Sequence, residues 1–159
     1  MQIDYYFSTI SPFTYLSGTR PAQVAAKHGA SLNYKPLDIM GLFGRTGGTP
    51  PKDRHENRKA YRLTEMRRAA AKLEMPINLQ PAHWPTNAVR DGSGDVADLV
   101  AGLTRACWAE EKDIAQDEVI GDCLVAAGFD RTLVDHDMMQ GAETYARNLE
   151  DAVKAGAFG

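Results

Sequence analysis

The chain has 159 residues, 43% of them hydrophobic, and a net charge of −3 at pH 7, enough for one domain or for a small domain with a large insertion. No basic block is present, which argues against a nucleic-acid interface, and no apolar run approaches the length of a membrane span. Cys107 and Cys123 form neither a C-x-x-C motif nor a zinc set. With no secretory signal pattern, we expect a reduced, cytoplasmic protein without a metal.

The first 38 residues predict a strand, a helix and a second strand. Residues 3–7 are short and aromatic, as in a buried strand, and residues 32–37 alternate like another. Between them, residues 12–28 have helical spacing, and Pro21 predicts a kink or a split within this helix. This order favours a right-handed crossover between two parallel strands.

Ser11 lies where the first strand passes into the helix. Serine is a strong N-cap residue, and Pro12 suits the first helical position. The positive end of a helix dipole also favours an anion, including a thiolate. Capping alone is the more frequent role of such a Ser-Pro pair, so a binding role depends on the surrounding residues.

Residues 40–53 are rich in glycine and proline and predict a loop, either a surface loop or a binding loop. Residues 53–73 predict a basic helix. A charged helix is most often a solvated face, and the alternative is that two or three of its cations face the Ser11 region. These cations are Arg54, Arg58, Lys59, Arg62, Arg67, Arg68 and Lys72.

Pro81 and Pro85 keep residues 80–87 extended, and Asn87 at the end of this segment either caps the next segment or binds a ligand. Helices are predicted over residues 95–110, 117–127, 130–140 and 142–155. No further strand is evident after residue 38, and two parallel strands do not make a stable sheet alone. Either the helices cover a very small sheet, or the strands that complete it lie beyond Gly159, in which case we expect that the chain is truncated or a fragment.

Several short motifs occur together and in order. They are Asp4-Tyr5-Tyr6-Phe7, Ser11-Pro12-Phe13-Thr14-Tyr15-Leu16, Arg58-Lys59-Ala60-Tyr61, Trp84-Pro85-Thr86-Asn87, Cys107-Trp108-Ala109-Glu110 and Ala152-Val153-Lys154-Ala155-Gly156-Ala157-Phe158-Gly159. In this order they resemble the 2-hydroxychromene-2-carboxylate isomerases and the related kappa-class glutathione transferases. Both groups are DsbA-like proteins.

The resemblance implies an α/β, thioredoxin-like fold interrupted by a large all-helical insertion. Residues 1–45 would form the N-terminal half of the thioredoxin-like domain and residues 46–155 the insertion. Residues 156–159 would begin the C-terminal half, which in relatives continues with a cis-proline, two strands and a helix. Relatives are commonly dimers, so the resemblance also implies a homodimer.

The resemblance further implies that Ser11 takes the place of a redox cysteine and donates a hydrogen bond to the sulfur of bound glutathione. The glutathione thiolate would add to the chromene of a small aromatic carboxylate substrate, so that the ring opens, a carbon–carbon bond rotates and the thiol leaves. Contacts with glutathione or substrate are implied for Phe13, Gly48, Thr49, Arg58, Lys59, Trp84 and Asn87.

Three other functions compete with the isomerase. A kappa-like glutathione transferase would use the same serine-activated thiol on other electrophiles. A non-catalytic helical module would have no affinity for glutathione. A DsbA-like oxidase is the least favoured, because Ser11 and Thr14 cannot form a disulfide.

Overall fold

Two parallel strands, β1 (Gln2–Phe7) and β2 (Ser31–Pro36), form the sheet in the part of the chain that the structure describes. This computed structural model describes residues 1–84, 95–135 and 138–158. The pairing runs in register from Gln2 opposite Ser31 to Phe7 opposite Pro36. The predicted parallel strand–helix–strand order is therefore confirmed.

The connection between the strands consists of two short helices, α1 (Pro12–Ser17) and α2 (Arg20–Lys27). The split anticipated at Pro21 falls three residues earlier, at Gly18, whose φ is +53°. Proline lacks an N–H group and clashes with the carbonyl four residues before it, so a continuous helix cannot pass this point. The freed carbonyl of Ser17 instead accepts a hydrogen bond from Arg20 Nε at 3.2 Å.

Residues 39–46 form a helix, so the prediction of a loop over residues 40–53 is wrong for this part. Helix α3 (Ile39–Thr46) begins at Asp38, whose side chain accepts a hydrogen bond from the Met40 backbone N–H at 2.9 Å. A Cβ atom on Gly41 would lie 3.1 Å from Leu149 Cδ2. The glycine therefore allows a close helix–helix contact and does not mark a loop here. A short 3-10 helix, η1 (Pro51–Asp53), follows.

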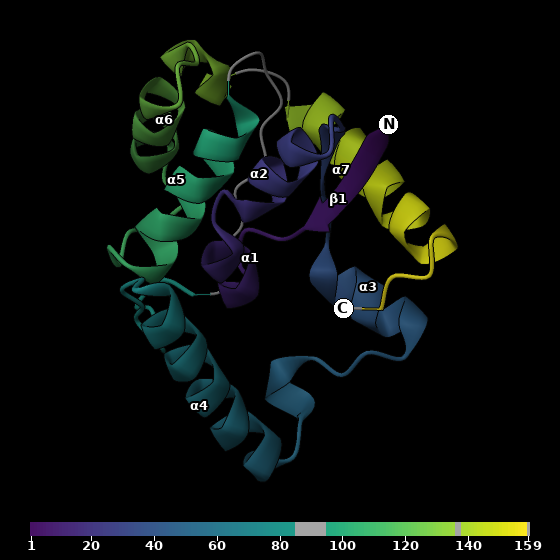
Figure 1. Ribbon diagram of the computed structural model, residues 1–159, viewed down its shortest axis with the longest axis vertical. Helices are drawn as coiled ribbons and strands as arrows, with labels where there is room; N and C mark the ends of the chain where they lie inside the picture. Colours follow the sequence, from purple (N-terminus) through teal and green to yellow (C-terminus); the bar gives the residue numbers. More distant parts are fainter. Residues whose placement is uncertain (85–94, 136–137, 159) are drawn as a thin grey trace.

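A large hydrophobic cluster joins α1 to the helices α4 (Glu56–Leu73), α5 (Val96–Trp108) and α6 (Asp117–Ala126) and to the 3-10 helix η2 (Arg131–Asp135). Figure 1 shows α5 and α6 side by side, with α4 extending away from them below. We call this the large cluster. Its buried members are Tyr15, Leu16, Met66, Ala70, Leu99, Leu103, Ala106, Cys107, Trp108, Ile114, Ile120, Leu124, Ala127, Phe129 and Val134.

A small hydrophobic cluster lies where the last helix, α7 (Met138–Lys154), packs against β2 and α3. Its buried members are Leu37, Leu42 and Ala152. Asn148 Nδ2 donates to the Pro36 carbonyl at 2.9 Å, and Lys35 Nζ donates to Asp151 at the same distance. Although α7 falls within the residues assigned to the insertion, it packs on the strand side of the molecule.

Near the C-terminal end, the observed bounds differ from those of two predicted helices. Residues 130–140 were expected to form one helix, but η2 ends at Asp135 and α7 already begins at Met138. The side chain of Asp130 accepts a hydrogen bond from the Thr132 backbone N–H, so the predicted cap starts a 3-10 turn. The prediction failed because an N-cap signal does not fix the length of the helix that follows it.

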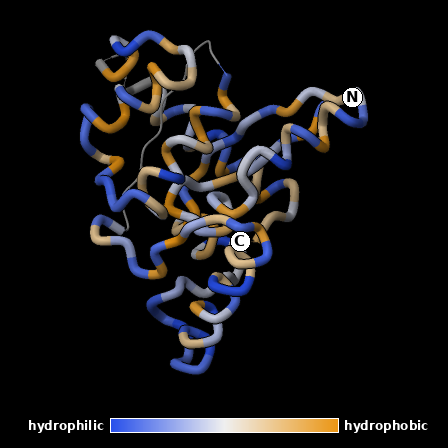
Figure 2. The backbone as a smooth tube through the Cα atoms, turned by 60° about the vertical axis from the view of Figure 1, so that its left-hand side comes forward, coloured by the Kyte–Doolittle hydropathy of each residue, from blue (hydrophilic) through white to orange (hydrophobic). Residues whose placement is uncertain are grey.

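Hydrophobic and hydrophilic residues alternate along most of the tube in Figure 2. This alternation is typical of amphipathic elements, each with one side buried. Among the residues that the structure describes, no helix is both long and apolar enough to cross a bilayer.

Candidate active site

Ser11 caps the first helix, as the sequence predicted. Its backbone is extended, at φ −87° and ψ 123°, and its Oγ accepts a long hydrogen bond of 3.4 Å from the Thr14 backbone N–H. Because Oγ acts here as an acceptor, its own hydrogen remains available for donation. Helix α1 has only six residues, so its dipole is weaker than that of the predicted helix over residues 12–28.

A cavity of about 250 Å³ has Ser11 in its wall. We call it the serine cavity. It lies where the loop after β1 faces α3, η1 and α4. Its other lining residues are Ile10, Phe13, Ile39, Met40, Phe43, Pro51, Arg54, Arg62 and Trp84. Among the described residues of this lining, the only charged side chains are two arginines, so the cavity favours an anion.

Arg62 projects from α4 and is half-buried. Its Nη1 contacts Met66 Sδ at 3.3 Å, and its Cζ lies 5.9 Å from the centre of the Phe13 ring. Burial lowers the pKa of the Arg62 guanidinium, and the nearby charge of Arg54 lowers it further. Its environment therefore disfavours the positive charge, and a bound anion would relieve that cost.

Arg54 lies on the side of the serine cavity opposite Arg62, where two contacts hold it. Its Nε donates to the Thr49 carbonyl at 2.8 Å, and its Cζ lies 6.0 Å from the centre of the Phe43 ring. In the described part of the chain, neither Arg54 nor Arg62 forms an ion pair with a carboxylate. The terminal nitrogens of Arg54 are thus free to bind a ligand.

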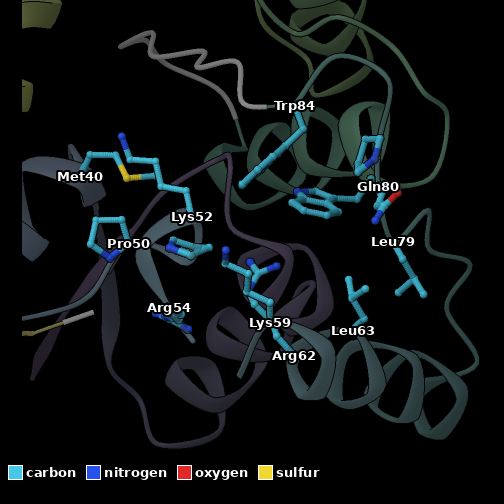
Figure 3. A pocket seen from close by; sticks show the side chains of 13 residues that line it. Met40, Pro50, Lys52, Arg54, Lys59, Arg62, Leu63, Leu79, Gln80 and Trp84 are labelled. Carbon is cyan, nitrogen blue, oxygen red and sulfur yellow. The ribbon is translucent and has the colours of Figure 1, made fainter. Parts of the chain in front are cut away.

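A larger cavity of about 770 Å³ adjoins the serine cavity, and we call it the indole cavity. The two cavities share Met40, Pro51, Arg54, Arg62 and Trp84. In Figure 3, Lys59, Arg62 and Leu63 rise from α4, with Leu79, Gln80 and Trp84 on one side and Met40, Pro50, Lys52 and Arg54 on the other. Among the described residues that line the indole cavity, four are cations and none carries a carboxylate.

The two tryptophans of the chain both line the indole cavity. The Trp84 indole donates through Nε1 to the Ile10 carbonyl at 2.8 Å, next to Ser11. The Trp108 ring centre lies 6.2 Å from that of Trp84, at 57°. Trp108 Nε1 is buried and has no hydrogen-bond partner in the described structure. An aromatic ligand in this cavity would lie beside two indole rings, of which that of Trp108 is almost fully buried.

The predicted binding residues divide into three groups. Phe13 and Trp84 lie in the serine cavity with Ser11, and Lys59 lines the indole cavity. Arg58 is exposed and lines neither of the two cavities. Asn87 lies outside the described residues.

Gly48 and Thr49 affect the serine cavity only through the residues that they contact. A Cβ atom on Gly48 would lie 2.3 Å from the Phe43 ring, so the glycine leaves room for a wall residue of the serine cavity. Thr49 is exposed and contributes only its backbone carbonyl, which holds Arg54. Neither residue lines either of the two cavities.

Arg54, Arg62 and Trp108 were not singled out from the sequence. Two cations of the region predicted as a basic helix, Arg54 and Arg62, nevertheless line the serine cavity with Ser11, although only Arg62 lies on α4, which begins at Glu56. One signal was available for Arg62, which lies four residues before Met66, on the side expected to face inward. For Arg54 there was none, because it precedes α4.

The cysteines of the chain stay out of both cavities. Burial, together with Asp113, raises the pKa of the Cys107 thiol to about 11, and burial also raises the pKa of Cys123. Neither thiol is therefore an activated nucleophile. Among the described residues, no group of three His, Cys, Asp or Glu side chains is placed to hold a metal ion.

Comparison with known proteins shows the family. The model of the DSBA-like thioredoxin domain matches residues 2–159, and the chain belongs to this family. The thioredoxin-like fold predicted from the sequence is thereby confirmed.

Curated relatives that match the chain along its length are named 2-hydroxychromene-2-carboxylate isomerase, in agreement with the resemblance noted above. The protein from Pseudomonas putida is 28% identical over 170 residues, covering 100% of this chain and 82% of the relative. The protein from Sphingobium xenophagum is 26% identical, covering 99% of this chain and 85% of the relative.

Solved structures support the fold. A 2-hydroxychromene-2-carboxylate isomerase structure superposes with a TM-score of 0.76 at 21% identity and covers 100% of this chain and 82% of its own. A probable DsbA oxidoreductase from Streptomyces coelicolor gives 0.69 at 15% identity, with 100% of this chain and 77% of its own covered.

Proposed function

We propose that this protein is a glutathione-dependent isomerase that interconverts 2-hydroxychromene-2-carboxylate and trans-o-hydroxybenzylidenepyruvate in aromatic catabolism. One observation carries the proposal: Ser11 lines a cavity in which every charged lining residue that the structure describes is a cation. The names of the curated relatives support the choice of reaction. The cavity chemistry independently supports an anionic, aromatic substrate.

The residues present fit a bound thiolate. The Ser11 hydroxyl accepts from the Thr14 backbone and keeps a hydrogen to donate, and a thiolate sulfur is an acceptor. Arg54 and Arg62 give this space a positive potential, which lowers the pKa of a thiol placed in it. The thiols of the chain itself lie elsewhere and are held protonated by burial, so the nucleophile has to come from a ligand.

Glutathione, when bound, supplies a thiolate that adds reversibly to a conjugated double bond. The chain contributes the remaining requirements. Ser11 holds the sulfur by a hydrogen bond, the Trp84 and Phe13 rings exclude water beside it, and the arginines offset the negative charge that ring opening places on oxygen. Holding both reactants in one enclosed space lowers the entropic cost of their reaction.

The first test is a steady-state assay that follows the absorbance of trans-o-hydroxybenzylidenepyruvate, with and without glutathione. We expect turnover that requires glutathione. Ser11→Ala should lower kcat/KM about a hundredfold or more, as the loss of one positioned hydrogen-bond donor does at other sites where negative charge is stabilised. Ser11→Cys should not restore full activity, because a larger, weaker donor would occupy the place of the hydroxyl.

Ser31→Ala is the matched control, because Ser31 is exposed at the start of β2 and lines neither cavity. It should turn over as the unmodified protein does. Turnover without glutathione, or unchanged turnover by Ser11→Ala, would refute the proposal. Conjugation of a generic electrophile without isomerisation would assign the site to a kappa-like transferase instead.

A further inference from the structure

Arg54 and Arg62 are two cations that form no ion pair with a carboxylate of the described chain, and the charge of Glu65 offsets only part of the lowering of the Arg62 pKa. They are close enough for the charge of Arg54 to lower the pKa of Arg62. Each lies against an aromatic ring, Arg54 against Phe43 and Arg62 against Phe13. Two like charges held together in partly apolar surroundings disfavour each other, and an anion bound between them removes that repulsion.

Contacts to the protein hold both guanidinium groups. The Thr49 carbonyl accepts from Arg54 Nε, and Met66 Sδ contacts Arg62 Nη1. The remaining N–H groups are left for a ligand. Guanidinium groups match the two oxygens of a carboxylate in planar, bidentate hydrogen bonds.

The position of the pair indicates what the anion is attached to. Arg54 and Arg62 belong to the lining of both cavities. On one side lies Ser11, and on the other lies the indole cavity with Trp84 and Trp108. A ligand whose carboxylate meets the arginines can therefore place an aromatic ring between them and the indoles.

We infer that Arg54 and Arg62 form a carboxylate clamp for a planar aromatic acid whose ring lies in the indole cavity. The inference deepens the proposed function, on which the identity of the acid as substrate rests. Binding by the clamp does not require glutathione. The clamp assigns substrate positioning to two residues and leaves outside it Arg58, which is exposed one turn earlier on the same helix.

The first experiment changes the ligand and leaves the protein unmodified. Calorimetric titrations of the full chain use trans-cinnamate and its neutral isostere trans-cinnamamide, without glutathione. A hydrogen-bonded charge pair makes us expect about ten- to hundredfold weaker binding of the amide. Because both tryptophans line the indole cavity, cinnamate should also change the intrinsic fluorescence, and Trp84→Phe should reduce that change. Equal affinity for acid and amide would overturn the clamp.

The second experiment changes the protein. Arg62→Gln and Arg54→Gln should each weaken cinnamate binding about tenfold or more, and Arg62→Lys should restore part of the loss, since it keeps the charge without the planar fork. Arg68→Gln is the matched control, being an exposed arginine of α4 that lines neither cavity. It should bind as the unmodified protein does. Unchanged cinnamate affinity in both glutamine variants would refute the clamp.

Glutathione also carries carboxylates, so it is titrated separately. We expect Arg62→Gln to keep the glutathione affinity of the unmodified protein while losing affinity for cinnamate. Loss of glutathione binding with cinnamate binding intact would overturn the inference. In the assay, Arg62→Gln should raise KM more than it lowers kcat. Clamp binding without any turnover would refute the proposed isomerase and support the clamp. Turnover with a KM that Arg62→Gln leaves unchanged would support the isomerase and refute the clamp.

Discussion

The large cluster and the small cluster hold opposite walls of the cavities, and they differ in how much they bury. Fifteen buried residues make up the first and three the second, in the described part of the chain. The wall next to the large cluster carries Arg62 and Trp84, and the wall next to the small cluster carries Ile39, Met40 and Phe43. Few buried contacts mean low local stability, so Arg62 lies on the firmer wall, whereas Arg54, which lies against the Phe43 ring, is on the more adjustable one.

The largest effect on stability is expected at the centre of the large cluster. Trp108 is among the largest fully buried side chains, so Trp108→Ala should lower the free energy of unfolding by about 3–5 kcal/mol. Urea denaturation followed by circular dichroism measures the change. Val125→Ala is its control, because that valine is 55% exposed on α6, and it should change the free energy by less than about 0.5 kcal/mol. A loss below about 1 kcal/mol for Trp108→Ala would contradict the comparison.

In the small cluster, Leu42→Ala should cost about 2–3 kcal/mol, the lower part of the range for buried leucine, because fewer neighbours surround it. Hydrogen exchange sharpens this test. Relative to the unmodified protein, we expect Leu42→Ala to show faster hydrogen exchange in α3 and α7 and unchanged exchange in α5. Equal acceleration in all three helices would show that the two clusters unfold as one unit. The exposed Val24, substituted by alanine, serves as the control.

Two glycine-to-alanine substitutions in the same region should change the free energy of unfolding in opposite directions. Gly48→Ala places a Cβ atom 2.3 Å from the Phe43 ring and 3.0 Å from the Phe158 carbonyl, so it should cost about 1–3 kcal/mol. The displaced ring would also narrow the serine cavity and weaken ligand binding. Gly44→Ala on α3 meets nothing within 4 Å and should stabilise by about 0.5–1 kcal/mol. Thermal unfolding of both variants measures the two stability changes. Changes of the same sign in both variants would contradict this prediction.

The smallest effect concerns the ion pair between Lys35 and Asp151, which links β2 to α7. The hydrogen bond from Lys35 lowers the pKa of the Asp151 carboxyl below its usual value. Its contribution to stability is therefore present above the unfolded pKa of about 3.9 and is lost as pH falls through the lower folded pKa. Asp151→Asn should make stability slightly less dependent on pH in this acid range.

Acid titration of the unfolding midpoint at low and high salt measures this effect, which should shrink with salt because both groups are partly exposed. The control is Asp53→Asn, on an exposed carboxylate of η1 that forms no ion pair in the described structure. A pH dependence that is the same in Asp151→Asn and the unmodified protein would rule out a contribution from this pair.

The candidate site was partly predictable because some of its signals are local. The Ser11-Pro12 pair fixes a helix start through its own backbone and side chain, and the structure has that cap. Which turn of α4 meets the cavity was not predictable in the same way. Arg58 and Arg62 are chemically identical and lie one turn apart on the same face of the helix, so only the packing of the helix, with Arg62 beside the buried Met66, decides that Arg62 lines the cavity and Arg58 is exposed.

The sequence by itself determined the two parallel strands, the serine cap between them, the basic helix and the resemblance to the family, because each depends on spacing along the chain. Only the tertiary structure decided that residues 39–46 form a helix, since Gly41 there serves a close contact with α7. It also decided that Arg54 and Arg62 meet in one cavity. Contacts between distant elements depend on how their apolar faces pack, and that information is not contained in any one segment.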